Sequence, residues 1–343
     1  MCIRDREKGY DDLMASLKKP EPVTDGRKAA IIGGGPTGIA AAYFLGRAGI
    51  PVTVFEQSHK LGGVPRLVIP GFRISEEAIE KDIALMRFYG AEVKLNTPAP
   101  SVSELKAMGY THIFFAVGAG KAGQLDIPGN VVPVIQWLRD LKAGKEVSLG
   151  HVAVVGGGNV AIDVARNACR LGSEHVEMFC LESEAQMPAS EEERREAIED
   201  GAHISCGWGP KEVHLDEAGR VCGITFKRCT RVFDDEGRFA PEYDENDLRR
   251  VDADRVVMSI GQSIVWGDLL AGSKVELGRG QGALADPQTY QTAEPDIFVG
   301  GDVYTGPSFA IDAIAAGHEA AVSIHRFVQP GSTLTIGRNQ RRY

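Results

Sequence analysis

The chain has 343 residues, of which 43% are hydrophobic and 25% charged, as in a globular protein long enough for two domains of ordinary size. Its net charge of -9 at pH 7 excludes the basic character typical of nucleic-acid-binding proteins. The longest uncharged apolar stretch, residues 29–45, is interrupted by four glycines and a proline, so we expect no membrane span.

The cysteines and histidines predict the compartment of the protein and whether it has a metal site. The two ends of the chain predict whether it is a fragment. Six cysteines without a C-x-x-C pair are typical of a reducing compartment, and the histidines show no metal-ligand spacing, so we expect a cytoplasmic protein without a metal site. The charged start shows no signal peptide, and residues 1–6 look like a translated sequencing adapter. Because residues 335–343 lack a helix stop signal, we expect the chain to be a fragment.

The first third of the chain alternates strands and helices. Hydrophobic patterns and caps predict a short helix and linker over residues 7–26, a strand over 29–32, a helix over 39–47, a strand over 52–55, a helix over 76–89 between the N-cap Ser75 and the stop residue Gly90, and a strand over 113–118.

A dinucleotide-binding turn follows the first strand. Gly33 allows the tight turn, Gly35 lets the backbone approach a pyrophosphate, and Gly38 lets the helix pack closely on the strand. We include Pro36, inside this turn, among the cofactor-binding residues. Glu56 ends the next strand, where a carboxylate can accept a hydrogen bond from a ribose hydroxyl.

Three further features favour flavin adenine dinucleotide (FAD) at this turn. Gly63, after Gly62, permits close backbone approach beside the ribose and phosphates. Asp302 offers a carboxylate to the ribityl chain. The predicted helix start at residues 308–311 can place its positive dipole end against the flavin pyrimidine ring, worth about 0.3–1 kcal/mol when exposed.

The same strand, glycine turn and helix recur later in the chain. The predicted elements are a helix over 134–143, a strand from 151, a helix over 163–171, a strand over 176–180, a helix over 191–199 with a capping box of Ser190 and Glu193, an antiparallel meander with turns at 216–219 and 234–237, a strand over 256–261, a strand from 297 that ends in Asp302, and a helix over 308–328.

The second turn predicts a nicotinamide nucleotide. Its residues are Gly156, Gly158, Asn159, Val160 and Ala161, with Ala161 at the packing position, and Gly261 ends a later strand that repeats the pattern at Gly118.

Glu182 follows the next strand, where a carboxylate repels the 2′-phosphate of NADPH and accepts from the free 2′-hydroxyl of NADH. We therefore expect NAD rather than NADP. In the alternative, Glu182 points to solvent and Arg194 or Arg195 reaches the 2′-phosphate.

Nearly the whole chain resembles the flavin domain of the glutamate synthase small-subunit family. The runs that carry the resemblance are residues 56–63, 69–73, 125–129, 156–163, 187–190 and 301–302. In such proteins the arginine that matches Arg73 contacts the flavin. The resemblance also implies an iron–sulfur domain or partner subunit that exchanges electrons with the flavin.

These observations predict an α/β fold of two Rossmann-like domains, similar to glutathione reductase, with the NAD domain inserted into the FAD domain. The predicted boundaries are a remnant and linker over 1–26, an FAD-binding domain over 27–130 and 286–343, and an NAD(P)-binding domain over 131–285.

The predicted function is hydride transfer between NAD(P)H and FAD. This chemistry needs no acid, base or nucleophile from the chain. The alternatives are a non-catalytic nucleotide-binding or scaffold subunit, and a flavin-dependent monooxygenase or disulfide reductase. The latter would need an oxygen-activating pocket or a substrate-side cysteine pair, for which we find no motif.

Overall fold

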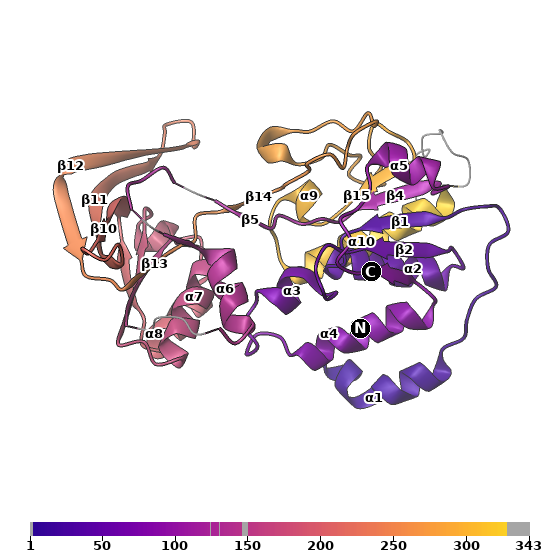
Figure 1. Ribbon diagram of the computed structural model, residues 1–343, viewed down its shortest axis with the longest axis horizontal. Helices are drawn as coiled ribbons and strands as arrows, with labels where there is room; N and C mark the ends of the chain where they lie inside the picture. The colour runs from indigo at the N-terminus through magenta and orange to yellow at the C-terminus, as the bar shows by residue number, and fades with distance from the viewer. Residues whose placement is uncertain (1–2, 124, 130, 146–149, 328–343) are drawn as a thin grey trace. The chain divides into compact units, whose positions relative to one another are not determined.

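The computed structural model describes residues 3–123, 125–129, 131–145 and 150–327 (Figure 1). The predictions for residues 1–2 and 335–343 therefore lie outside the described residues. Within the described part, the chain forms two compact units. The first comprises residues 3–67, 71–120 and 263–327, and the second comprises residues 68–70 and 121–262. The second unit is thus inserted into the sequence of the first.

The first unit follows the predicted alternation of strand and helix. Its helices are α1 (Ile3–Ser16), α2 (Pro36–Arg47), α3 (Gly63–Leu67), α4 (Glu76–Phe88), α5 (Val102–Ala107), α9 (Asp302–Thr305) and α10 (Ala310–Arg326), with a 3-10 turn, η2, at Arg279–Gln281. Its strands are β1 (Ala29–Ile32), β2 (Val52–Phe55), β3 (Glu92–Lys94), β4 (His112–Phe115) and β15 (Ile297–Val299).

These five strands form one parallel sheet in the order β15-β4-β1-β2-β3. The first strand of the chain is central, and Ala29 pairs with both Val52 and His112. All four residues of β1 are buried. A parallel sheet that is covered on both faces needs such continuous apolar runs, which explains why β1 and β2 were predicted at their observed bounds.

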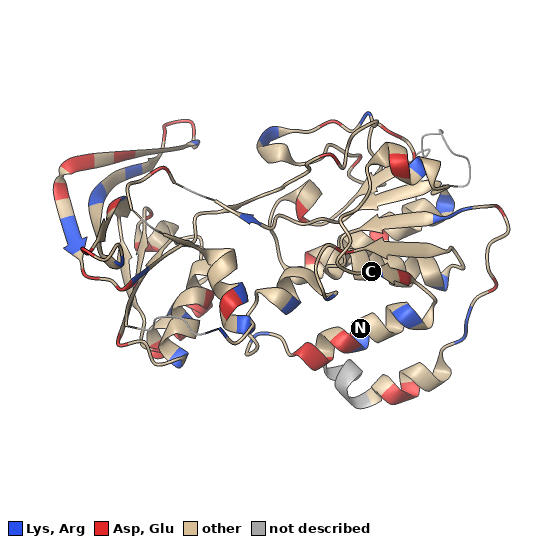
Figure 2. Cartoon of the chain, viewed as in Figure 1, with Lys and Arg blue, Asp and Glu red and all other residues tan. Residues whose placement is uncertain are grey.

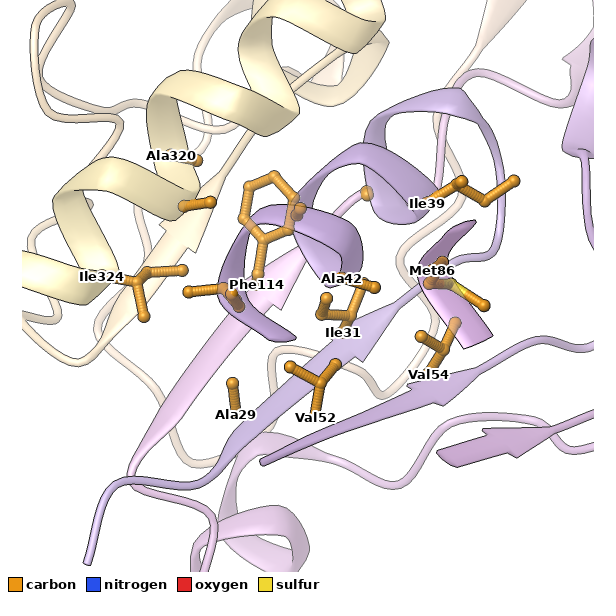
Figure 3. Packing of buried hydrophobic residues seen from close by; sticks show 14 of the residues in the cluster. Ala29, Ile31, Ile39, Ala42, Val52, Val54, Met86, Phe114, Ala320 and Ile324 are labelled. Atoms are coloured by element: carbon orange, nitrogen blue, oxygen red, sulfur yellow. The ribbon is translucent and has the colours of Figure 1, made fainter. Parts of the chain in front are cut away.

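Alternate strand residues face two separate cores. On one face, Ile31, Val54 and Phe114 pack with residues of α2, α4 and α10 (Figure 3). On the other face, Ile32 and Phe115 pack with α5 and with part of the segment 264–285. Successive side chains of a strand point to opposite faces of the sheet, so each strand contributes to both cores of the first unit.

The second unit repeats this sheet. Its helices are α6 (Val134–Lys142), α7 (Asn159–Arg170) and α8 (Glu191–Glu199), with a 3-10 turn, η1, at Glu184–Gln186. Its strands are β6 (Val132–Pro133), β7 (His151–Val155), β8 (His175–Cys180), β9 (His203–Cys206), β10 (Trp208–Leu215), β11 (Val221–Phe233), β12 (Phe239–Val251) and β13 (Arg255–Met258), and short β5 (Lys121–Ala122) pairs with β14 (Gln262–Ser263). The parallel order β6-β13-β7-β8-β9 places β7 between β13 and β8, as β1 lies between β4 and β2.

The predicted meander is β10-β11-β12, an antiparallel sheet. Its turns are closed by backbone hydrogen bonds from Asp216 N to Arg220 O (2.8 Å) and from Asp234 N to Arg238 O (2.9 Å). Acidic residues are spread along β12, which has two arginines near its end, and basic residues lie on β11 (Figure 2). Lys227 lies 2.6 Å from Glu245 across the two strands, so opposite charges accompany the strand pairing.

The predicted helix caps are present. Ser75 Oγ accepts from Ala78 N at 3.2 Å, and Ser190 Oγ accepts from Glu193 N at 3.3 Å, the serine half of the predicted capping box. Strands β4 and β13 end before Gly118 and Gly261, earlier than predicted. Both glycines have positive φ, +69° and +85°, which turns the chain out of the extended conformation.

The return to the first unit comes at residue 263, not at the predicted boundary of 286. The reason is packing. Trp266 is buried, its ring lies edge-on to Phe115 with centroids 5.5 Å apart, and its indole N–H donates to Gln281 O at 2.8 Å. This segment completes the second core of the first unit. Likewise, residues 121–123 and 125–129 belong to the second unit.

No helix among the described residues has the length and apolar character needed to cross a membrane.

A polar network joins the meander to the parallel sheet of the second unit. Glu177 on β8 is only 7% exposed. Its Oε1 accepts from Ser205 Oγ at 2.6 Å and from an Arg249 guanidinium nitrogen at 2.7 Å, while Arg249 also donates to Ser205 at 2.8 Å. The guanidinium lies 5.2 Å from the centroid of Phe179. The network thus ties β8, β9 and β12 together.

We expect Arg249→Ala to lower the free energy of unfolding by about 1–3 kcal/mol, because the buried Glu177 carboxylate loses its charged partner. Urea unfolding of the variant and of the parent measures the loss. The matched control is Arg250→Ala, which removes an exposed arginine from the same strand and should change stability by less than about 0.5 kcal/mol. Equal losses in the two variants would contradict the role of the network.

Candidate functional site

The first glycine turn joins β1 to α2 and requires glycine at two positions. Gly33 has a φ of +105°, and its N–H donates to Phe55 O at 2.9 Å. A Cβ on Gly33 would lie 2.4 Å from Ala116 O, and a Cβ on Gly38 would lie 1.9 Å from Gly33 O. The backbone itself occupies the space that a side chain would need, so helix and strand meet at van der Waals distance.

Gly35 lies between Gly33 and Gly38, but the backbone geometry does not require glycine at this position. The nearest atom to a Cβ at Gly35 would be Gly63 Cα at 3.9 Å, and its φ of -78° suits any residue. It is the N-cap of α2, and no side chain caps that helix. The space in front of α2 is therefore open where a pyrophosphate would meet the positive end of the helix dipole.

The helix starts differ in how their first N–H groups are capped. Helices α4, α5 and α8 begin with serine side chains that accept from backbone N–H groups, at Ser75, Ser101 and Ser190. Helices α2 and α7 begin with Gly35 and Gly158 and have no side-chain cap, which is also true of α6, α9 and α10. The first N–H groups of a helix need an acceptor from outside the helix. A bound phosphate would supply one at both glycine turns.

Glu56 is held against the first turn. Glu56 is only 6% exposed, and its carboxylate accepts from Gly34 N at Oε2 and from Ser58 N at Oε1, each at 2.7 Å. A carboxylate has about four lone-pair positions, so each oxygen can accept one more hydrogen bond. Glu56 thus presents a fixed acceptor beside the turn, as a ribose diol would require.

Two distant segments converge on the same turn. Gly62 N donates to Gly34 O at 2.8 Å, and a Cβ on Gly63 would lie 2.8 Å from Gly35 Cα. From near the end of the first unit, Gly301 approaches α2 so closely that a Cβ would lie 2.4 Å from the Thr37 hydroxyl. The structure thus brings together the glycines that the sequence places far apart.

Asp302, at the start of α9, lies next to this convergence. Burial raises the pKa of its carboxyl group, and hydrogen bonds from backbone groups of Ser308 and Ala119 partly offset that effect. Ser308 precedes α10, and Phe309 and Ile311 at the start of that helix are each 68% exposed. The acid and the exposed helix start are therefore both available to a ligand of the first unit.

The second turn, from β7 to α7, repeats the backbone geometry of the first. Gly156 has a φ of +144°, its N–H donates to Phe179 O at 2.8 Å, and a Cβ there would lie 2.1 Å from Ser259 O. Ala161 at the packing position is fully buried. Nothing lies within 4 Å of a Cβ on Gly158, so the space before α7 is open as well.

Glu182 occupies the place that Glu56 has in the first unit. Its Oε2 lies 3.0 Å from where a Cβ on Gly157 would be, so the carboxylate is beside the turn, and the side chain is partly exposed. The turn is supported by Ala189 N, which donates to Gly157 O at 2.9 Å, and by Ser190 N, which donates to Asn159 Oδ1 at 3.2 Å.

The remaining predicted site residues are Val160, Gly261 and Arg73. Val160 lies in the first turn of α7 and is partly buried. Gly261 follows Ser259, which packs on the second glycine turn, and has open space around it. Arg73 lies before α4, with its guanidinium 5.5 Å from the centroid of Phe72. A role for Arg73 rests on the family resemblance.

Several residues that shape the turns were not among the predicted site residues. Gly34 and Ser58 fix Glu56 through their N–H groups, and Thr37 and Ser259 are the close neighbours of Gly301 and Gly156. The run of three glycines in each motif was the available signal for Gly34. Nothing in residue type marks Ser58 or Ser259, because only backbone atoms of these residues make the contacts in question. In the described ranges, no group of three His, Cys, Asp or Glu side chains could hold a metal ion.

Comparisons with known proteins agree with this geometry. The family model described as pyridine nucleotide-disulphide oxidoreductase matches residues 27–317. The chain is 35% identical over 326 residues to the NADP(+)-dependent formate dehydrogenase subunit beta of Moorella thermoacetica, covering 91% of this chain and 45% of that subunit. It is 30% identical over 353 residues to the glutamate synthase (NADPH) small chain of Escherichia coli (strain K12), covering 94% of this chain and 72% of the small chain. The predicted resemblance is confirmed.

Among solved structures, the thioredoxin reductase of T. acidophilum superposes with a TM-score of 0.70 at 17% identity, covering 88% of this chain and 98% of that one. This likeness confirms the predicted fold class of two Rossmann-like domains. The chain spans less than half of the length of the formate dehydrogenase subunit.

The glycine turns predict a contrast between two substitutions. Gly33→Ala should destabilise the protein by at least about 1–3 kcal/mol, because a Cβ collides with a carbonyl oxygen and φ is positive. Gly35→Ala should leave stability within about 0.5 kcal/mol, because its space is open and its φ is ordinary. Thermal unfolding without added nucleotide measures both. A stable Gly33→Ala variant would contradict the close backbone approach.

Proposed function

The chain belongs to the pyridine nucleotide-disulphide oxidoreductase family, and we propose that it is a flavin-dependent oxidoreductase that transfers a hydride between NADH and FAD. One observation carries the proposal. Each unit has an uncapped, open glycine turn at a helix N-terminus, with a carboxylate at the end of the neighbouring strand. Two dinucleotide sites in one chain suit a transfer between their cofactors.

FAD suits the first unit. Gly35 would face the pyrophosphate, Glu56 the adenosine ribose and Asp302 the ribityl chain, with Gly63 close to the phosphates. The exposed start of α10 would direct its dipole toward the flavin ring and stabilise negative charge there. Arg73 would contact the flavin, as the family resemblance implies.

NADH suits the second unit because carboxylates lie beside its turn, while the Arg194 guanidinium of the following helix donates to Glu184 O at 2.6 Å. Glu182 lies against Gly157, and the first turn of α8 adds three carboxylates, Glu191, Glu192 and Glu193, directly after Ser190, which bonds Asn159 in α7. A 2′-phosphate would meet like charge there, whereas a free 2′-hydroxyl can donate to Glu182. The two relatives described above are named for NADP or NADPH, so this proposal distinguishes the chain from them.

The chain's own contribution is binding and orientation. When bound, the nicotinamide and the flavin supply the hydride donor and acceptor, so no side chain needs to act as acid, base or nucleophile. The glycine turns anchor the phosphates, and the two carboxylates orient the riboses.

We further propose that electrons pass between the flavin and an iron–sulfur domain or partner subunit. The family resemblance implies such a module. The two relatives described above are named as a subunit beta and a small chain, that is, as parts of larger enzymes. Because the chain has no C-x-x-C pair, we propose that any iron–sulfur ligands lie on another domain or subunit. We expect that assembly in the cytoplasm.

The test is an anaerobic titration of FAD-loaded protein with NADH and, separately, with NADPH, followed through the visible absorption of oxidised flavin. We expect NADH to bleach the flavin at lower concentration than NADPH. Gly35→Ala is the matched control, since it should fold but fail to retain FAD.

Bleaching by NADPH alone would overturn the NADH preference and keep the hydride transfer. A protein that binds FAD but is bleached by neither nucleotide would contradict hydride transfer and favour a non-catalytic nucleotide-binding subunit.

A substitution at Glu182 tests the nucleotide preference directly. Glu182→Gln keeps the size of the side chain and removes its charge, so the ratio of kcat/KM for NADH over NADPH should fall by about tenfold, equivalent to about 1.4 kcal/mol. Glu184→Gln, an exposed glutamate in the adjacent η1 turn, is the control and should leave the ratio unchanged. An unaltered ratio in Glu182→Gln would show that Glu182 does not read the ribose.

A further inference from the structure

Two cysteines lie side by side at the ends of adjacent strands of the second unit. Cys180 is the last residue of β8 and Cys206 the last of β9, and they are register partners in the parallel pairing. Their sulfur atoms are 3.7 Å apart, and both cysteines are free. They are far apart in the sequence, so only the sheet brings them together.

The backbone spacing suits a disulfide. Neighbouring strands are about 4.8 Å apart, inside the range of about 4.4–6.8 Å that disulfides span between Cα atoms. Closing the bond would bring the sulfurs from 3.7 Å to about 2.05 Å.

The two thiols differ in accessibility. Cys180 is only 3% exposed, whereas Cys206 is partly exposed. Burial, followed by the neighbouring Cys206, raises the pKa of the Cys180 thiol far above its ordinary value. An oxidant in solution therefore reaches Cys206 first, and Cys180 is positioned to react with the oxidised sulfur.

We propose that Cys180 and Cys206 are a peroxide-sensitive thiol pair, which closes to a disulfide beneath the second glycine turn and weakens nicotinamide nucleotide binding there. The second half of this proposal rests on the proposed function of that turn.

The chemistry balances with one peroxide. The Cys206 thiolate attacks a peroxide oxygen, which breaks the O–O bond and leaves a sulfenic acid and hydroxide; this hydroxide takes up the proton lost by the Cys206 thiol and becomes water. The Cys180 sulfur then attacks the Cys206 sulfur, the S–O bond breaks, and the departing hydroxide takes the Cys180 proton to form a second water. Two thiols are oxidised, one peroxide is reduced to two waters, and a dithiol reductant reverses the change.

Cys180 lies beside the candidate nucleotide site. The Cβ of Cys180 lies 2.9 Å from where a Cβ on Gly157 would be. The Cys180 thiol lies 3.6 Å from Glu182 O, which also accepts from Gly207 N at 3.0 Å, next to Cys206. A sulfur that moves toward Cys206 loses its contact with Glu182 O and strains the segment that positions the Glu182 carboxylate.

The test treats the FAD-loaded full chain with hydrogen peroxide. We expect the intact mass to fall by two hydrogens and a proteolytic digest to contain a peptide linked through Cys180 and Cys206, both reversed by dithiothreitol. Cys180→Ser and Cys206→Ser should each abolish the linkage. Cys222→Ser, which removes a partly exposed cysteine on β11, is the matched control and should retain it. A digest without the linked peptide would overturn the proposal.

Nucleotide binding tests the second half. The oxidised protein should bind NADH at least about tenfold more weakly than the reduced protein, with recovery after dithiothreitol and with unchanged FAD content. Cys206→Ser should bind equally before and after the same treatment. Equal affinities in oxidised and reduced parent would refute the coupling. A reduced protein that binds neither NADH nor NADPH would overturn the proposed function and this coupling with it, while the linked peptide still decides whether the disulfide forms.

Discussion

The structure depends on the close approach of backbone to backbone at the two glycine turns. At Gly33 and Gly156 a side chain would collide with a carbonyl oxygen, and at Gly38 it would collide with the turn itself. Because no side chain intervenes, the N-terminus of each following helix comes directly to the end of a buried strand. Its unpaired N–H groups are then held by a rigid sheet, which is what a phosphate-binding site requires.

The two units use this arrangement with different surroundings. In the first, Glu56 is buried and fixed by two backbone donors, and segments from three parts of the chain close around the turn. In the second, Glu182 is partly exposed and followed by the acidic start of α8. The backbone geometry is therefore shared, whereas the charge beside each turn differs. In our proposal that difference determines which nucleotide each unit accepts.

Short sequence patterns predicted helices and strands correctly where a single local feature, such as an apolar run or a helix cap, determines the element. Continuous apolar runs marked β1 and β2, and serine caps marked the starts of α4 and α8. The predicted domain boundary at residue 286 differs from the observed one at residue 263, because tertiary packing determines that boundary. Residues 263–285 belong to the first unit because side chains of this segment, among them Trp266 on Phe115, pack in the second core of that unit. A boundary in such a segment follows from burial that the local sequence does not encode.

The sequence by itself determined the two glycine turns, the carboxylates Glu56 and Glu182, and the repeated α/β pattern, because these depend on residue type at short spacing. Only the tertiary structure decided which groups from distant parts of the chain contact the glycine turns and the two carboxylates. The contact of Gly301 with Thr37, the backbone donors to Glu56, and the sulfur contact between Cys180 and Cys206 join residues that the chain separates. Sheet register and helix packing bring such groups together, and both are properties of the whole unit rather than of any local run.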